Sequence, residues 1–545
     1  ESQSIVSLEE LASSADSDLS IELDDEDKVS SWDDSSASHI TLGSQISSDS
    51  SSVEISGSTV TITKAGTYVI SGNVTEGNII VNATDKGTVR LILNNASISN
   101  TTTAPIKVLD AKKVILTLAD NTTNTITDKT RQSVDDEDFS SAVYSKADLV
   151  FNGSGTLNVN AGYRNGIKST DDLKVVSGTF NITSNEDGII GKDLLGIKDG
   201  KFTIKSGSDG MKSTYDTDTS KGNIVITGGE FDIMASNDGI HCNEDILISG
   251  GNLTISSGDD GVHADAALQV DGGTIAIKKC CEGLEGVQIT LNNGDISIVA
   301  SDDGINAADG SSSSGMGMGG FGGGQNGGFG GGQASSSDSS VLLTINGGNI
   351  FVNAGGDGLD SNGNIVMNGG NVTVLGPTSD GDTALDFDGA FTINGGVLMA
   401  FGSSGMLETP TSAQNGCCIV TTLGTVSANS AFSLTDSSGN MIMSYTPTKN
   451  YASAIVYSSD IKSGSTYTVT AGSTTQSITV NSNVTTNGVS GGFGGGQNGG
   501  FGGGQRGGQP GGSNQQGGNQ QGGMPGGNSG NGRSNSASSS TVNQV

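Results

Sequence analysis

Apolar and polar residues alternate in short runs along most of this chain. From about residue 53 such runs follow one another closely, as in STVTITKAGTYVISG (58–72) and KKVILTLAD (112–120). Alternation with a period of two is typical of β-strands that bury one face. No helical period stands out, and no apolar run approaches the roughly 20 residues that span a bilayer. The pattern predicts an all-β protein.

The alternating runs also repeat, with a period of about 22 residues. An acidic or amide residue followed by glycine marks each copy, at 165–166, 187–188, 209–210, 238–239, 260–261, 282–283, 303–304 and 357–358. Two intervals are longer because they hold TYDTDTSK (214–221) and a Gly-rich insert (311–340). A propeller blade needs about 40–50 residues, so a repeat this short predicts one rung of a parallel β-helix, a solenoid.

Composition changes along the chain predict four regions. Residues 1–52 are rich in Ser, Asp and Glu and are expected to form a disordered acidic tether. Residues 53–405 should form the β-helix, interrupted by the low-complexity insert. Residues 406–488 still read as strands with hairpin signals and predict a small C-terminal β module or cap. Residues 489–545 are rich in Gly, Gln and Asn and predict a disordered tail.

A β-helix would turn the repeat into columns, with one residue per rung. Aligned on the marker glycine, the next residue is always apolar and the third is small, so both columns should face inward. The intervening column should face outward, either as a solvated polar ladder or as a strip that contacts carbohydrate. Its lysines suit acidic sugars and its histidines suit hydroxyl groups. The candidate carbohydrate-binding residues in it are Lys168, Lys212, His241, His263, Asn306 and Asp360.

The residues before the marker glycines form an acidic column. Asp and Asn suit turns and Gly tolerates positive φ, so turn chemistry alone is one explanation. However, carboxylates stacked about 4.8 Å apart repel one another, and a Ca²⁺ ion with oxygens at about 2.3–2.6 Å could join neighbouring rungs. We therefore expect Ca²⁺ as a cofactor. The candidate ligands are Asp187, Asp209, Asp238, Asp259, Asp260, Asp302, Asp303 and Asp357.

The charge and the cysteine content limit the classes of molecule that this protein is expected to bind. The formal net charge is −33, which argues against binding nucleic acid or anionic membranes and fits a protein that binds cations. The 5 cysteines comprise two adjacent pairs and one single residue, which is neither a zinc spacing nor an even disulfide set. We expect these thiols to be structural.

Four segments of the sequence resemble one bacterial family. They are TITKAGTYVISGNVTEGNIIV, APIKVLDAKKVILTLADNTTNTITD, AVYSKADLVFNGSGTLNVNAGYRNGIKSTDDLKV and DSSGNMIMSYTP. Through them the chain resembles carbohydrate-binding domain-containing proteins over about residues 55–470. The resemblance implies a right-handed parallel β-helix similar to polysaccharide lyases of the pectate lyase type. It also implies calcium, and binding of cellulose or acidic plant polysaccharide at the cell surface.

Three functions remain compatible with the sequence. We favour a non-catalytic, extracellular, calcium-dependent protein that binds plant cell-wall polysaccharide such as polygalacturonate or cellulose, attached to the bacterial surface by a lipid at a processed N-terminus. A pectate-lyase-like enzyme is an alternative, with Arg164 and Lys168 as the candidate catalytic residues, although a groove-lining cation also explains Arg164. The third hypothesis is a fibre that self-associates through the Gly-rich segments or the β-helix ends.

Overall fold

The computed structural model describes residues 19–129, 139–215, 217–309 and 340–489. Almost all of its regular structure is β-strand, and α2 (Asp25–Lys28) is the only helix among the described residues. The predicted all-β class is therefore confirmed. In the described ranges no helix has the length and apolarity that crossing a membrane requires. Most of the predicted insert (311–340) and C-terminal tail (489–545) lies outside the described residues.

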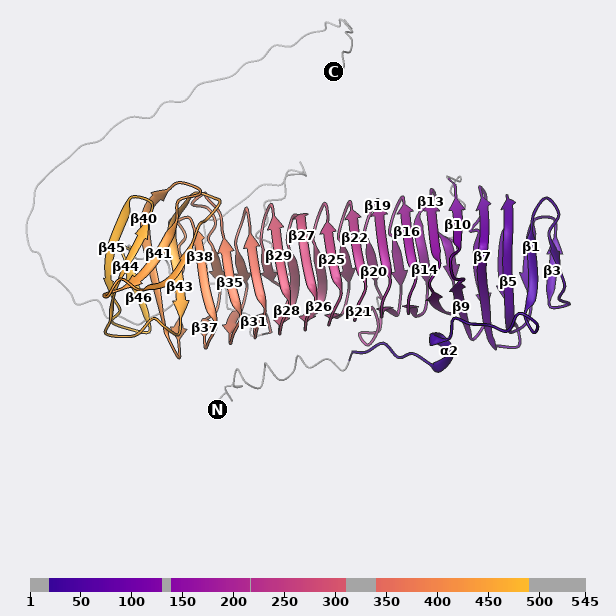
Figure 1. Cartoon of the computed structure of the whole chain (residues 1–545), viewed down its shortest axis with the longest axis horizontal. Coiled ribbons are helices and arrows are strands. Elements are labelled where there is room, and N and C mark those ends of the chain that lie inside the picture. Colours follow the sequence, from indigo (N-terminus) through magenta and orange to yellow (C-terminus); the bar gives the residue numbers. More distant parts are fainter. Residues whose placement is uncertain (1–18, 130–138, 216, 310–339, 490–545) are drawn as a thin grey trace, which may run out of the picture. The chain divides into compact units, whose positions relative to one another are not determined.

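Three strands per repeat pair in parallel with their counterparts one repeat before and after, which produces three parallel arrays. In Figure 1 the strands follow one another along the long axis in chain order. The first array contains β7 (Thr88–Asn100), β10 (Thr123–Asp128), β13 (Thr156–Ala161), β16 (Thr179–Ser184), β19 (Lys201–Ser206), β22 (Glu230–Ala235), β25 (Asn252–Ser256), β27 (Thr274–Cys280), β29 (Asp295–Ala300), β32 (Asn349–Asn353), β35 (Asn371–Leu375) and β38 (Val397–Gly402).

The second array follows the marker glycines and carries the candidate site. It contains β4 (Thr59–Ile62), β6 (Asn78–Asn82), β8 (Ile106–Asp110), β11 (Ser141–Ser145), β14 (Asn165–Ser169), β17 (Ile189–Gly191), β20 (Met211–Ser213), β23 (Ile240–Cys242), β26 (Val262–Val270), β28 (Leu284–Leu291), β30 (Ile305–Ala307), β33 (Leu359–Ser361) and β36 (Leu385–Phe387).

The third array completes each repeat, and the long strands β26 and β28 belong to both the second and the third. Its other members are β9 (Lys113–Leu118), β12 (Asp148–Gly153), β15 (Leu173–Val175), β18 (Leu194–Ile197), β21 (Asn223–Ile226), β24 (Ile246–Ile248), β31 (Leu342–Ile345), β34 (Asn364–Met367), β37 (Phe391–Ile393) and β39 (Ser412–Ala413).

Residues at the same position in successive repeats pair directly, as the sequence predicted. In the second array Met211 pairs with Ile240, and Ile240 pairs with Val262. The apolar column after the glycines is buried throughout, and so is the small column that contains Cys242. Both inward columns are confirmed. In the first array the rings of Phe180, Phe202 and Phe231 stack, with centroids 5.0 and 4.8 Å apart.

The marker glycines serve a different purpose from the one expected. None of them has positive φ. Instead, consecutive copies approach one another so closely that a Cβ on Gly239 would lie 2.5 Å from the carbonyl oxygen of Gly261 and 2.4 Å from Cγ2 of Ile255. The expectation of a left-handed turn is corrected: these positions need glycine because a neighbouring backbone fills the space of a side chain.

The N-terminal region is ordered from residue 19, which corrects the predicted disordered tether over residues 1–52. Strands β1 (Ser38–Leu42) and β2 (Ser47–Ser48) join the large sheet, and α2 packs beside β12. The buried ammonium of Lys113 lies 2.8 Å from carboxylate oxygens of both Asp24 and Asp27. Two further strands, β3 (Val53–Ser56) and β5 (Gly66–Thr75), complete this end of the sheet. Residues 1–18 lie outside the described residues.

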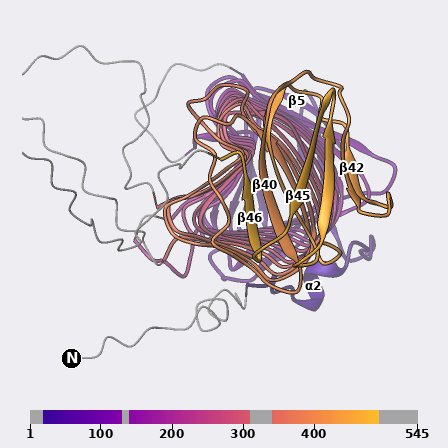
Figure 2. The same ribbon diagram turned by 90° about the vertical axis from the view of Figure 1, so that its left-hand side faces the viewer.

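The C-terminal strands change from parallel to antiparallel pairing. Strand β43 (Tyr451–Ser458) pairs antiparallel with both β38 and β40 (Cys417–Val426), and β46 (Val484–Asn487) pairs parallel with β40. A separate four-stranded sheet contains β41 (Phe432–Asp436), β42 (Met441–Tyr445), β44 (Thr466–Ala471) and β45 (Thr474–Thr479). Figure 2 shows these strands in front of the stacked arrays.

Candidate functional site

Two neighbouring columns of the second array bring most of the predicted site residues together. The predicted outward column is in register from rung to rung, because Lys212 pairs with His241 and His241 pairs with His263. It is not simply solvated: most of its members are half-buried, and Ile190 and Asn306 are buried. The acidic column runs beside it, three residues earlier in each repeat. Lys168, Lys212, His241, His263, Asn306 and Asp360 all lie in the half-buried column.

Most acidic residues of the column use one side-chain oxygen to hold the next rung, and Glu282 is the exception. Oδ1 of Asp238 accepts a hydrogen bond from the backbone N–H of Asp260 at 3.0 Å. The same contact recurs along the column, for example at 3.1 Å from Asp209 N–H to Asp187 Oδ1. Oδ1 of Asn165 accepts the corresponding bond from the backbone N–H of Asp187, which explains why an amide side chain can replace a carboxylate at this position. The other carboxylate oxygen is left for a second partner, and that partner differs along the column.

In the first part of the site, lysine and histidine side chains balance the negative charge of the carboxylates. Lys212 Nζ lies 2.6 Å from Oδ2 of the fully buried Asp209. Asp209 Oδ1 accepts from Asn237 Nδ2 at 2.7 Å, so both oxygens of this predicted calcium ligand are occupied. Burial alone would raise the pKa of Asp209, but the imidazole of His241, 3.8 Å away, and the ammonium of Lys212 hold it well below the usual range. Burial likewise opposes a charged His241, yet Asp209 and Asp265 outweigh it and raise its pKa to about 9.

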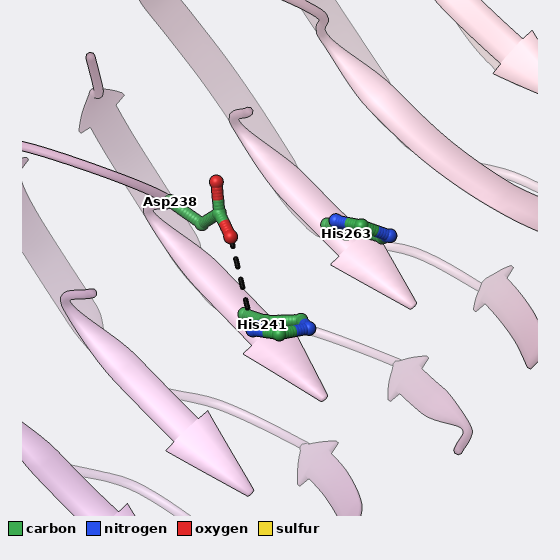
Figure 3. A group of neighbouring side chains, drawn as sticks. All are labelled: Asp238, His241 and His263. Carbon is green, nitrogen blue, oxygen red and sulfur yellow. Dashed lines mark ion pairs between the residues drawn. The ribbon is translucent and has the colours of Figure 1, made fainter. Parts of the chain in front are cut away.

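The two histidines form a stacked pair. Figure 3 shows the rings of His241 and His263 side by side on β23 and β26, with Asp238 beside His241. Their centroids are 5.0 Å apart with an interplanar angle of 28°. Nε2 of both rings meets the same Oδ1 of Asp265, at 3.4 Å from His241 and 3.2 Å from His263. Asp265 therefore fixes the orientation of both rings.

The later part of the site lacks such cations. Among the described residues of rungs 282–408, the two columns contain Glu282, Glu285, Asp303, Asp357, Asp360 and Asp386, with Glu408 beside them. Burial raises the pKa of Asp303 and of Asp357 to about 7 each, and that of Asp360 to about 9, and nearby carboxylates add to the shift. Repulsion is thus concentrated from Asp303 onward, where no lysine or histidine among the described residues of the columns relieves it, whereas His263 lies 3.3 Å from Glu285.

Two buried side-chain oxygens in this cation-poor part, Asn306 Oδ1 and Thr383 Oγ1, have no hydrogen-bond partner among the described residues. Asn306 Nδ2 donates to Glu282 Oε2 at 2.8 Å, but Asn306 Oδ1 is buried without a hydrogen bond to any described residue. Asn306 pairs with Glu285 on one side and with Asp360 on the other. An unsatisfied amide oxygen between two carboxylates is costly unless a cation or a proton lies near it.

The remaining predicted metal ligands differ in exposure. Asp187 and Asp260 lie within the acidic column and are half-buried and buried, whereas Asp259 and Asp302 are exposed beside it. Asp238, Asp259 and Asp260 nevertheless bring carboxylate oxygens within 4.8 Å of one another.

Arg164 is engaged in an ion pair. Its Nε lies 2.7 Å from Glu186 Oε2, and both side chains are partly exposed. A guanidinium held by a carboxylate stays protonated, which makes it a poor general base. Lys168 lies in the half-buried column, paired with Tyr144 and Ile190.

A cavity of about 380 Å³ adjoins the histidine pair. Asp265 lines it together with Asp245 and the amide side chains of Gln269 and Gln288. Ala267, Leu268 and Val287 supply an apolar part. The cavity thus combines hydrogen-bonding groups with an apolar surface, which suits a polar ring-shaped ligand.

Several residues of the site were missed in the sequence. Asp265 lies two positions after His263, and the two-residue period could have placed it on the same face. Asp386 continues the half-buried column, but its rung has Thr383-Ala384 instead of Asp-Gly, so the marker is absent. The apolar residue Leu385, which pairs with Leu359, was the sequence feature that could still have identified this repeat.

Comparisons with known proteins agree with the sequence resemblance. Residues 56–316 match the family model described as carbohydrate-binding domain-containing protein. A carbohydrate-binding domain-containing protein from Acetivibrio thermocellus is 36% identical over 126 residues, which is 23% of this chain and 44% of that protein. The chain therefore covers less than half of this relative.

A solved structure is also similar in sequence. It is the polysaccharide lyase-like protein from C. thermocellum, determined as a gadolinium derivative, with 30% identity and a TM-score of 0.42. The match covers 43% of this chain and 96% of that chain.

Proposed function

We propose that the protein, whose residues 56–316 match the model of the carbohydrate-binding domain-containing protein family, binds acidic polysaccharide through calcium ions held by the second array. The observation that carries the proposal is the cation-poor group of carboxylates over residues 282–408, with its unpartnered amide oxygen. We further infer that the three parallel arrays are the faces of a right-handed β-helix, and that the protein acts outside the cell.

The chemistry of the cation-poor part suits calcium. Ca²⁺ takes six to eight oxygen ligands at about 2.3–2.6 Å, so opposite ligands stand up to about 5 Å apart, close to the spacing of adjacent strands. Oδ1 of Asp303 accepts from the backbone N–H of Asp357, which leaves Oδ2 of Asp303 available. Glu285, Asn306 and Asp360 offer further oxygens from the adjacent column. All of these donors are oxygen, as calcium prefers.

Calcium would also explain how an acidic protein binds an acidic ligand. With a net charge of −33 the protein would repel a polyuronate. A calcium ion held by only some of its ligands can accept a sugar carboxylate in an open position. The cavity beside Asp265, with Gln269 and Gln288, provides hydroxyl-binding groups next to the same array.

Retention on immobilised polygalacturonate tests the proposal. We expect the full chain to be retained in Ca²⁺ and released by chelator, with weaker retention on uncharged cellulose. The double variant Asp303→Asn, Asp357→Asn should lose retention, because it removes two carboxylates from the cation-poor part. Asp232→Asn is the matched control, since Asp232 is exposed on β22 in the first array.

Each result that would contradict the proposal leads to a different conclusion. Equal retention with chelator, or no retention on polygalacturonate or cellulose in Ca²⁺, would refute the calcium-dependent proposal. Accumulation of unsaturated uronates would instead indicate the lyase alternative. In that enzyme Arg164 would have to act as the base, and its guanidinium is paired with Glu186. The fibre alternative rests in part on the Gly-rich segments, which lie mostly outside the described residues, while at one end β43 pairs with the last strand of the first array.

A further inference from the structure

The histidine pair offers nitrogen ligands, which separates it from the oxygen-only part of the second array. His263 Nδ1 lies 3.4 Å from Asp260 Oδ2 and 3.3 Å from Glu285 Oε2. One ligand atom from each of these three residues falls within 4.8 Å of the other two. The side chains of His263, Asp260 and Glu285 are 25%, 9% and 20% exposed, so the group is sheltered but reachable from solvent.

The contacts of the rings show which carboxylates face each nitrogen. A carboxylate only accepts, so Asp265 Oδ1 favours an Nε2–H on His241, its hydrogen-bond partner at 3.4 Å, and it lies 3.2 Å from Nε2 of His263. Each Nδ1 then faces carboxylate oxygens alone. His241 Nδ1 is 3.7 Å from Asp238 Oδ2, is buried, and has no hydrogen-bond partner among the described residues. Carboxylate oxygens gathered around an imidazole nitrogen repel one another, and either a proton on the ring or a bound metal ion relieves that repulsion.

The distances favour a metal ion over a proton. A charge-assisted N–H···O bond is about 2.7–2.9 Å long, and Lys212 to Asp209 at 2.6 Å shows that this array can make one. The 3.3 and 3.4 Å contacts of His263 Nδ1 are too long for such a bond. They match the separation of about 3.3–3.5 Å between two tetrahedral ligands at about 2.0–2.2 Å from zinc.

We propose that His263 Nδ1, Asp260 and Glu285 bind a divalent transition-metal ion of the zinc class, with the fourth position open to water or a ligand. One imidazole and two carboxylates are donors that such ions prefer, and calcium does not use nitrogen. Asp265 is a positioning residue, because its Oδ1 lies 3.2 Å from Nε2 of His263 and so favours the ring orientation that points Nδ1 at the ion. His241 and Asp238 stand beside the site as the stacked neighbour.

Cobalt titration of the full, metal-free chain tests this proposal. Co²⁺ is the probe because four- or five-coordinate Co²⁺ absorbs visibly and reports nitrogen and oxygen ligation. We expect the absorption to saturate at one ion per chain and to be displaced by Zn²⁺ but not by excess Ca²⁺. His263→Gln should abolish it, and Asp265→Asn should weaken affinity by about 10- to 100-fold.

His39→Gln is the matched control, since His39 lies in β1 with its side chain 40% exposed, beside Asp34. It should leave the absorption unchanged. Melting curves of each variant in chelator separate loss of the site from loss of the fold. The proposal is overturned if folded wild type shows no visible Co²⁺ band, or if folded His263→Gln keeps it. Retention on polygalacturonate is measured separately, so failure of this site and failure of the calcium proposal are distinguishable.

Discussion

At the scale of the residue, most acidic side chains of the column have two oxygens with different tasks, with Glu282 as the exception. One oxygen accepts the backbone N–H of the next rung, as Asp238 does from Asp260. The sequence predicted the acidic column but not this bond, because it depends on the separation between rungs. The sequence also showed where lysine and histidine enter the adjacent column. It could not show that the ammonium of Lys212 would form an ion pair with the carboxylate of Asp209.

The raised pKa values of Asp303, Asp357 and Asp360 predict how stability depends on pH without metal. A carboxyl whose folded pKa lies above its unfolded value of about 4 stabilises the fold fully only below that value. This contribution is lost as pH rises through about 7 for Asp303 and Asp357 and about 9 for Asp360. In chelator the melting temperature should therefore fall between pH 5 and pH 9.

The variant Asp360→Asn should flatten this dependence, because it removes the carboxyl with the highest of these pKa values. It should also melt higher than wild type at pH 9 in chelator. Asp232→Asn, on the exposed face of β22, should keep the wild-type slope. A metal-free melting temperature that is constant or rises from pH 5 to pH 9 would contradict the burial assigned to these carboxyls.

At the scale of the element, the sequence predicted the short strands of the second array. It predicted only part of the contacts between these strands. The two-residue period correctly placed Ile240 and Cys242 inward and His241 between them. The predicted reason for the glycine that precedes these strands, a left-handed turn, was wrong. Register depends on local alternation, which a sequence shows. Close approach depends on the neighbouring rung, which a sequence does not show.

The substitution Gly239→Ala tests this explanation of the glycine column. Its Cβ would meet Gly261 O at 2.5 Å and Ile255 Cγ2 at 2.4 Å, so strands must separate. We expect a loss of about 1–3 kcal/mol in the free energy of unfolding, measured by denaturant melting. Gly381→Ala is the control, because a Cβ there meets nothing within 4 Å and φ is not positive. A neutral Gly239→Ala would show that the rungs tolerate a side chain.

At the scale of the described molecule, charge is distributed unevenly along the second array. Lys168, Lys212, His241 and His263 lie in rungs before residue 264, while carboxylates without such partners follow from Asp303. The repeat in the sequence predicted both columns, and the resemblance added the carbohydrate. The contrast between a nitrogen-containing site and an oxygen-only site emerges only when the two columns lie side by side.

The most direct test of the account is the melting temperature of the full chain in Ca²⁺ and then in chelator at neutral pH. Calcium bound only to the folded state at 100 times its Kd would add about 2.7 kcal/mol of stability. We predict a higher melting temperature in Ca²⁺, reversed by chelator and lost in the double variant Asp303→Asn, Asp357→Asn. An identical melting temperature under both conditions would mean that the cation-poor carboxylates hold no calcium, and would contradict the central claim.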